Sequence, residues 1–431
     1  MRKMKREESR KGKEGGFLRM TFVKRWAIVL IAVAIGLSLP CGETQGASPP
    51  FRIGAVYDLT GGLASYGMGS SMTAKAAIER INKAGGIAGR QVEYIVEDGG
   101  TDAATGLRKM RKLVLKDECD FILLSCNSAL GVGAVPLAKE LDTIIFSEGT
   151  AREITGVKGN RYVFRQINNA EMAVIAMARF AAKDLGKNAY GMGNDYEWGH
   201  SVVDTAEKNF APFGVKMTGK SFAPIGTIDF VPYLVKIPKE TNFIVAAFLP
   251  ADFSKLTTQA YELGLRIPIF AGTIANLRYS DLGPGADLIW CGTYGSRTLE
   301  GFPPEVRSSQ KAYRDAVGLS DDGWHKDGKL TAEYIWAGWE GVSWIKKGVE
   351  DGGWKSKKDN MKFIKALEGA KVKASLDFPT GGKSMRAEDH QVMGDTYVIK
   401  AEKGGTVTKA CIRGEEILPL YPPNVDYRKE Q

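Results

Sequence analysis

Histidine and cysteine are scarce in this chain of 431 residues, which contains three histidines and five cysteines. The three histidines are far apart in the sequence and have no metal-binding spacing. No Cys-x-x-Cys pair, phosphate-binding P-loop, Gly-x-Ser-x-Gly elbow or Gly-x-Gly-x-x-Gly fingerprint occurs either. Because enzymes usually leave such local traces, the sequence predicts a protein without catalytic residues, metal or cofactor.

So few cysteines also exclude a small fold that depends on disulfide bonds. Cys119 and Cys126 flank one predicted strand, which separates them by about 20 Å and puts a disulfide out of reach. Cys291 and Cys411 each end an apolar strand, and the sequence fits either a bridge between them or two buried free thiols.

Basic charge is concentrated at the start of the chain, where residues 1–19 supply +5 of the net +9. The apolar run at 26–39 that follows is shorter than the roughly 20 residues that a membrane-spanning helix needs. A basic segment, a short apolar run and small residues are typical of an export signal, so we predict a leader at 1–47. A single membrane anchor is one alternative. A lipoprotein anchored at Cys41 is another, although Ser38 and Pro40 depart from the usual lipobox.

Without residues 1–47 the net charge falls to about +3, since most of the excess of Lys and Arg lies in the leader. The rest of the chain has no cluster of Lys and Arg interleaved with aromatic residues. We therefore expect no nucleic-acid partner.

Short apolar runs alternate with helical segments along the exported part. The first predicted strands lie at 51–57, 91–97, 120–124 and 143–146, with helices at 67–84, 102–116 and 131–141 between them. This alternation indicates βαβ units and a parallel sheet with helices on both faces. The pattern restarts with a helix at 170–184 and strands at 188–193, 215–222, 242–248 and 267–271, and further strands are predicted at 395–400 and 406–411.

Small, hydroxyl and aromatic residues follow the predicted strands. Ligands of open α/β sheets bind beyond the carboxyl ends of the strands, and free N–H groups at helix starts suit a carboxylate. The candidate binding residues are Tyr66, Gly67, Asn127, Ser128, Ser147, Gly149 and Thr150 in the first unit, and Tyr196, Trp198, Phe248 and Thr273 in the second. The alternatives are simple helix capping for Ser and Asn, and packing within its own unit for Trp198.

Several segments resemble, in order and spacing, the periplasmic solute-binding proteins of branched-chain amino acid type ABC transporters. They include IGAVYDLTGGLASYG, IIFSEGTAREIT, YVFRQINNAE, NDYEWG and EDHQVMGDTYVIKAEKGG. The resemblance implies an α/β fold of two Rossmann-like lobes, joined by three hinge crossings near Asn168, Tyr294 and Gln391, with the ligand cleft between them. The implied lobes are 48–168 plus 296–392 and 169–295 plus 393–431.

The resemblance also implies roles for the candidate residues. The loops of the first lobe would hold the carboxylate of the solute, while Tyr196, Trp198 and Phe248 would contribute from the second lobe. Asn169 and Thr273 stand where amino-acid-binding members have the Asp and Glu that hold the ammonium group. Because an unpaired buried ammonium is costly, either Glu148 or Glu197 replaces them or the solute is not an amino acid. An aromatic or aliphatic carboxylate or an amide would then be expected.

The implied function is an extracytoplasmic, periplasmic protein that captures a small solute bearing a carboxylate or amide. It would deliver this solute to the permease and ATPase subunits of an ABC importer. The alternative is a ligand-sensing module of the same fold that acts on a signalling partner, since a fold alone does not separate the two.

Overall fold

The first sheet has five strands in the order β2-β1-β3-β4-β5, and every neighbouring pair is parallel. The computed structural model describes residues 49–429, so the predicted leader and Cys41 lie outside the described residues. The strands are β1 (Phe51–Tyr57), β2 (Val92–Asp98), β3 (Phe121–Leu124), β4 (Ile144–Ser147) and β5 (Val163–Arg165). The first four agree with the predicted strands to within one residue. The fifth is too short to leave a sequence pattern.

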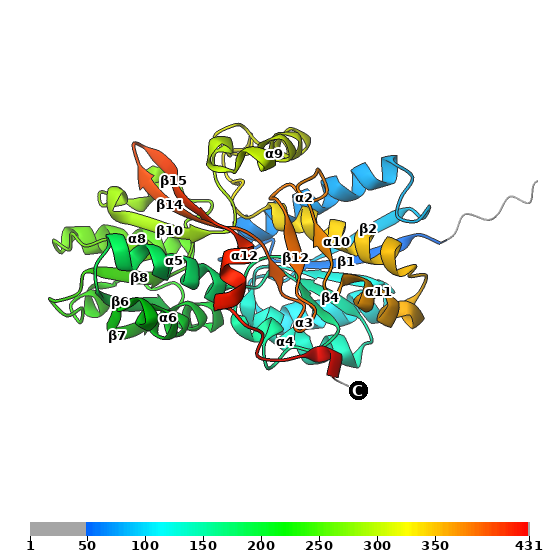
Figure 1. The fold of residues 1–431 in the computed structure, drawn as a ribbon, viewed down its shortest axis with the longest axis horizontal. Coiled ribbons are helices and arrows are strands. Elements are labelled where there is room, and N and C mark those ends of the chain that lie inside the picture. Colours follow the sequence, from blue (N-terminus) through cyan, green and yellow to red (C-terminus); the bar gives the residue numbers. More distant parts are fainter. Residues whose placement is uncertain (1–48, 430–431) are drawn as a thin grey trace, which may run out of the picture. The chain divides into compact units, whose positions relative to one another are not determined.

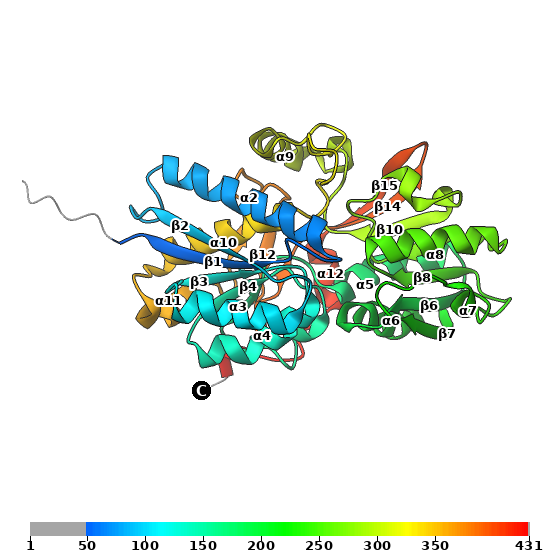
Figure 2. The same cartoon turned by 180° about the vertical axis from the view of Figure 1, so that it is seen from behind.

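Helices cover both faces of this sheet, as the alternating pattern predicts (Figure 2). One face carries α2 (Ala64–Lys83), α10 (Trp336–Gly352) and α11 (Asn360–Leu367), and the other carries α3 (Ala103–Leu115) and α4 (Ser128–Glu140). Trp339 and Trp344 of α10 are fully buried in the core beneath α2. Together with Trp336 they form a stripe of buried tryptophans on α10 that belongs to the core.

The second sheet combines strands from two parts of the chain, in the order β15-β14-β10-β9-β8-β6-β7. The strands are β6 (Asn188–Asn194), β7 (Lys216–Ala223), β8 (Phe243–Ala247), β9 (Ile269–Ala271), β10 (Ile289–Thr293), β14 (Thr396–Glu402) and β15 (Gly405–Ile412). The pairs among β6 to β10 are parallel, whereas β14 and β15 add antiparallel strands next to β10 (Figure 1).

Helices also lie on both faces of the second sheet. The core on one face includes α5 (Ala170–Asp184) and α6 (Glu197–Phe210), and the core on the other includes α8 (Pro250–Glu262). The remaining elements are the helices α7 (Val231–Leu234), α9 (Pro304–Val317) and α12 (Gly414–Ile417), and a small sheet of β11 (Lys371–Val372), β12 (Lys383–Met385) and β13 (Val392–Met393).

The chain passes between the two sheets after β5, after β10 and before β14. The first and third passages are hydrogen-bonded to each other, because Asn168 Nδ2 donates to the Gly394 carbonyl at 2.8 Å and its Oδ1 accepts from the Gly394 N–H at 2.9 Å. The C-terminal tail also reaches the region of the first sheet, where the Tyr427 hydroxyl donates to the Gly156 carbonyl at 2.8 Å. The α/β fold class is confirmed, and the residue limits of the lobes stay a prediction.

The four cysteines among the described residues are free thiols. Cys291 and Cys411 lie on β10 and β15, which are separated by β14, so no bridge joins them; Cys291 is a buried free thiol and Cys411 a half-buried one. Burial raises the pKa of the Cys411 thiol to about 12. Across residues 49–429, no helix combines the length and the apolar character that a membrane crossing requires.

Candidate functional site

A cavity of about 40 Å³ is lined mainly by residues that follow the carboxyl ends of strands in both sheets. The loops follow β1, β3 and β4 in the first sheet and β6, β8, β9 and β10 in the second. The lining residues are Leu63, Tyr66, Cys126, Thr150, Tyr196, Trp198, Leu249, Gly272, Thr273, Tyr294 and Tyr334. This is the position at which open α/β sheets bind ligands.

Five of the predicted binding residues line this cavity, namely Tyr66, Thr150, Tyr196, Trp198 and Thr273. They come from both sheets, as expected for a site between two lobes. Trp198 is 7% exposed and also packs in the core of the second lobe, so both interpretations of this residue describe part of its environment. Whether these side chains bind a ligand remains a prediction.

The other predicted loop residues lie behind the lining and hold the loops in place. Asn127 caps α4 by accepting from the Leu130 N–H, while the Ser128 hydroxyl accepts from the Ala151 N–H at 3.2 Å. Ser147 accepts from the N–H of Gly149 at 3.1 Å. These hydrogen bonds stabilise the loops that carry Cys126 and Thr150.

Gly67 and Phe248 also lie outside the lining. A Cβ atom at Gly67 would stand 2.1 Å from the carbonyl oxygen of Asp58, so the glycine allows α2 to approach the end of β1. Phe248 is 1% exposed and packs edge-to-face on Phe230, with ring centroids 5.4 Å apart, in the core against α8. Successive residues of a strand point to opposite faces, which places Phe248 on the α8 side and Ala247 on the α6 side.

Aromatic rings make up much of the cavity wall. Tyr66 and Tyr334 meet edge-to-face with centroids 5.3 Å apart, and Tyr294 lies 6.3 Å from Tyr334. Burial raises the pKa values of Tyr66, Tyr196 and Tyr294, so their phenols are neutral at pH 7. The Tyr66 and Tyr334 hydroxyls donate to the carbonyls of Ala275 at 3.2 Å and of Glu148 at 2.5 Å. These two hydroxyls therefore have partners within the protein.

Gly272 makes room for the indole of Trp198 in this wall. A Cβ atom at Gly272 would stand 2.9 Å from Cζ2 of the ring, which is closer than real Cβ contacts. The indole can therefore occupy this position only because residue 272 has no side chain.

None of the described residues that line the cavity has a charged side chain. Glu148 is buried nearby, where its carboxyl accepts from the Tyr57 hydroxyl at 3.0 Å and from the Ser70 hydroxyl at 2.6 Å. Burial raises its pKa to about 8, so this carboxyl is neutral at pH 7. Glu197 is exposed at the start of α6. Neither acid supplies a negative charge to the wall.

Asn169 is likewise occupied by the protein. Its Oδ1 accepts from the Met172 N–H at 2.9 Å, which caps α5, and its Nδ2 donates to the Tyr421 hydroxyl at 2.6 Å. Thr273 lines the cavity but brings only a hydroxyl, which accepts from the Ala275 N–H at 3.2 Å. The two positions that depart from the amino-acid-binding pattern therefore supply no counter-charge for an ammonium group.

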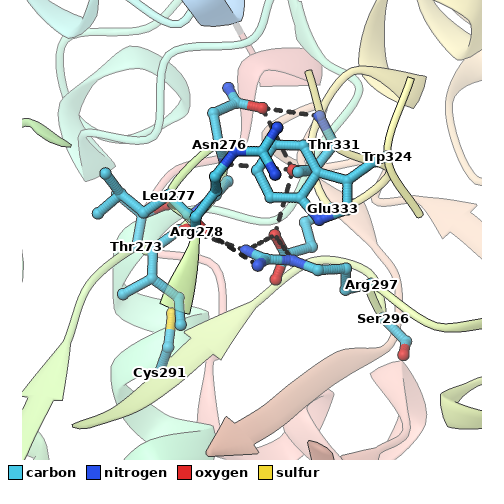
Figure 3. A network of polar contacts seen from close by, with 12 residues as sticks. Thr273, Asn276, Leu277, Arg278, Cys291, Ser296, Arg297, Trp324, Thr331 and Glu333 are labelled. Carbon is cyan, nitrogen blue, oxygen red and sulfur yellow. Dashed lines mark hydrogen bonds and ion pairs between the residues drawn. The ribbon is translucent and has the colours of Figure 1, made fainter. Parts of the chain in front are cut away.

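A buried polar network links the Thr273 loop to the segment that leads to Tyr334 (Figure 3). Arg297 pairs with Glu333 at 2.6 Å and also donates to the carbonyl oxygens of Ile274 and Leu277. Thr331 donates to the same Glu333 carboxylate at 3.2 Å. Because Glu333 immediately precedes Tyr334, this network fixes two parts of the cavity wall relative to each other.

Direct contacts join elements of the two sheets. The backbone N–H of Arg152 donates to the Ser201 hydroxyl at 3.2 Å, and the Arg152 guanidinium lies 3.4 Å from the Glu171 carboxylate. The Tyr66 hydroxyl reaches the Ala275 carbonyl on the opposite side. Elements of the two sheets therefore contact each other directly beside the cavity.

The arrangement suits a small, largely apolar ring rather than chemical conversion. Tyr and Trp rings offer stacking surfaces, and the hydroxyls of Thr150 and Thr273 offer limited hydrogen bonding. Among residues 49–429 no cluster of His, Cys, Asp and Glu is placed to hold a metal ion.

Sequence reasoning missed Tyr294 and Tyr334 as wall residues. Tyr294 was identifiable as a hinge position, and hinge segments run along the floor of such a cleft. Tyr334 lies just before α10, whose buried tryptophans indicate a core helix. A sequence pattern of that kind does not show that a neighbouring residue faces the cavity. Leu63 and Leu249 lie in loops and carry no periodic signal.

Residues 50–406 match the family described as periplasmic binding protein. Leu/Ile/Val-binding protein homolog 4 of Brucella abortus is 25% identical over 381 residues, which cover 84% of this chain and 86% of that protein.

Solved structures give the same picture of the fold. An ABC-transporter solute-binding protein of R. palustris, in complex with 4-hydroxybenzoate, has a TM-score of 0.72 at 19% identity and covers 84% of this chain and 97% of its own. A leucine-binding protein of Thermotoga maritima has a TM-score of 0.72 at 19% identity, and the match covers 85% of this chain and 99% of that protein. These likenesses confirm the expected fold.

Proposed function

Because the chain belongs to the periplasmic binding protein family, we propose that it is the solute-binding component of an ABC importer and that its solute is a small aromatic carboxylate. The relatives and solved structures named above are binding proteins, not enzymes, which agrees with the expected lack of catalytic residues. Two of them are named for branched-chain amino acids and one contains 4-hydroxybenzoate. We therefore choose between an amino acid and an aromatic carboxylate from the residues that line the cavity.

The observation that carries the proposal is an aromatic cavity wall without an ionised acid. A bound amino acid would bury its ammonium group beside Asn169 and Thr273, which offer no negative charge, at a cost of several kcal/mol. A ring stacked between Trp198 and Tyr66 needs no such partner. The proposed solute carries its carboxylate toward Thr150, in the loop that follows β4.

Titration calorimetry with 4-hydroxybenzoate and with leucine tests this proposal. We expect saturable binding of the aromatic acid and none of leucine at the same concentration. At 100 times the Kd, the bound acid stabilises the protein by about 2.7 kcal/mol, which raises the melting temperature. Binding of leucine alone would contradict the proposal.

The proposed site of action is the periplasm, with delivery to a permease and its ATPase. This location follows from the family and from the export signal expected at 1–47. N-terminal sequencing of the exported protein is expected to begin close to Ser48, and an uncleaved N-terminus would contradict the leader. The names of the relatives favour transport over a sensor that acts on a signalling partner.

A further inference from the structure

A buried guanidinium with unused donors lies next to the cavity wall. Arg165 ends β5 and is 0% exposed. Its Nη2 donates to the Ala151 carbonyl at 2.8 Å, while Nε and Nη1 have no hydrogen-bond partner among residues 49–429. Ala151 directly follows Thr150, which lines the cavity. The donors of this side chain are therefore incompletely used at a position just behind the wall.

Arg165 also has no ion-pair partner among the described residues, whereas the buried Arg386 and Arg297 each pair with an acid. Asp389 is engaged by Arg386 in two hydrogen bonds, at 2.8 and 2.5 Å. Glu333 is engaged by Arg297. An arginine stays protonated even when buried, and an unpaired buried charge costs several kcal/mol. The Arg165 charge therefore has no ion-pair partner among the described residues, although Asp389 lies near enough to favour it electrostatically.

The position of Arg165 links it to the passages between the lobes. Its backbone N–H donates to the His390 carbonyl at 3.1 Å, and the residue bridges to Gln391. Its positive charge lowers the pKa of the Tyr294 phenol, against the larger effect of burial. Tyr294 lines the cavity, so the guanidinium acts on the end of the cavity that Thr150 and Tyr294 form.

We infer that Arg165 is the specificity-determining residue that makes this site select an anion. The carboxylate of the solute binds at the Thr150–Tyr294 end, and the guanidinium behind these residues supplies the opposing charge. A zwitterion gains less, because its ammonium group is repelled by the same charge and finds no ionised acid. The inference rests on the proposed function and adds the physical basis of its ligand class.

The test compares 4-hydroxybenzoate with its neutral analogue 4-hydroxybenzamide, which has nearly the same shape. We expect the wild-type protein to bind the acid at least tenfold more tightly, which corresponds to about 1.4 kcal/mol. In Arg165→Gln the preference is expected to disappear while the affinity for the amide changes little. Arg165→Lys keeps the charge and is expected to keep most of the preference.

Arg161→Gln is the matched control, since Arg161 precedes β5 and is paired with Glu368 at 3.0 Å. This variant is expected to retain the wild-type preference. Equal wild-type affinities for the acid and the amide would overturn the inference, even if Arg165→Gln does not fold. An unchanged preference in a folded Arg165→Gln would overturn it as well. Failure of the proposed function differs from both, because leucine would then bind and neither aromatic compound would.

Discussion

At the scale of single residues, Gly272 leaves room for the Trp198 ring in the cavity wall. A methyl group at this position would lie 2.9 Å from that ring, so the ring would have to move. Overpacking of this kind costs about 1–3 kcal/mol, so we expect Gly272→Ala to weaken solute binding by about tenfold or more. Gly405→Ala is the control, because a Cβ atom there meets nothing within 4 Å. Equal affinities of the two variants in calorimetry would contradict the assigned wall.

Glu148 gives the protein a pH dependence with a definite sign. Its pKa is about 4.5 when unfolded and about 8 when folded, because burial and the nearby Asp58 charge disfavour the charged form more than the hydrogen bonds from Ser70 and Tyr57 favour it. Between these values the folded state holds one proton more than the unfolded state. The free energy of unfolding should therefore fall by about 1.4 kcal/mol per pH unit as the pH rises.

Urea unfolding of the wild type and of Glu148→Gln between pH 5 and 8 measures this effect. The glutamine amide does not titrate, so the free energy of unfolding of the variant is expected to fall less steeply with pH. Identical pH dependence of the two proteins would show that Glu148 is already ionised in the folded state.

At the scale of elements, the Arg297–Glu333 pair joins the loop after β9 to the start of α10. Removal of one partner of a buried pair leaves the other charge uncompensated and costs about 3–5 kcal/mol. We expect Glu333→Gln to lose about that much stability in urea unfolding. Glu350→Gln is the control, because Glu350 lies on the exposed surface of α10 and pairs there with Lys346 at 2.9 Å. This variant is expected to lose less than 1 kcal/mol of stability. Similar losses in the two variants would contradict the role of the network.

The elements differ in how well the sequence predicts them. The alternation of strands and helices predicts β1 to β4 and β6 to β9, because each overlaps a strand-like run of at least four residues in the sequence. β5 has three residues, and the small sheet of β11 to β13 has strands of two or three, so no periodicity can form. The final two strands are predictable as strands, but their place beside β10 depends on long-range pairing that no local pattern contains.

The candidate site shows the same division. Tyr196 and Trp198 are predictable because they follow a strand at the expected edge of the sheet, where ligands bind. Tyr334 and the unpaired Arg165 are not, since their importance depends on which distant groups the fold places next to them. Phe248 was predicted to line the pocket but packs in the core, because its position after a strand does not show on which face of the sheet its side chain lies.

At the scale of the whole molecule, we expect solute binding to depend on contacts between elements of the two sheets beside the cavity. The hydrogen bond from the Arg152 N–H to Ser201 joins the segment after β4 to α6. A typical hydrogen bond contributes about 1 kcal/mol, so Ser201→Ala is expected to weaken solute binding about fivefold with little change in the stability of the solute-free protein. Calorimetry and thermal unfolding check the two parts. Unchanged affinity would show that this contact does not contribute to binding.

The central claim is that the protein captures an aromatic carboxylate and not an amino acid. The most direct measurement is to denature the purified protein and identify the released solute by mass spectrometry. We expect a small aromatic acid without an amino group, because Tyr and Trp rings form much of the wall and none of its described residues is an ionised acid. Recovery of leucine or another zwitterionic amino acid in stoichiometric amount would contradict the account.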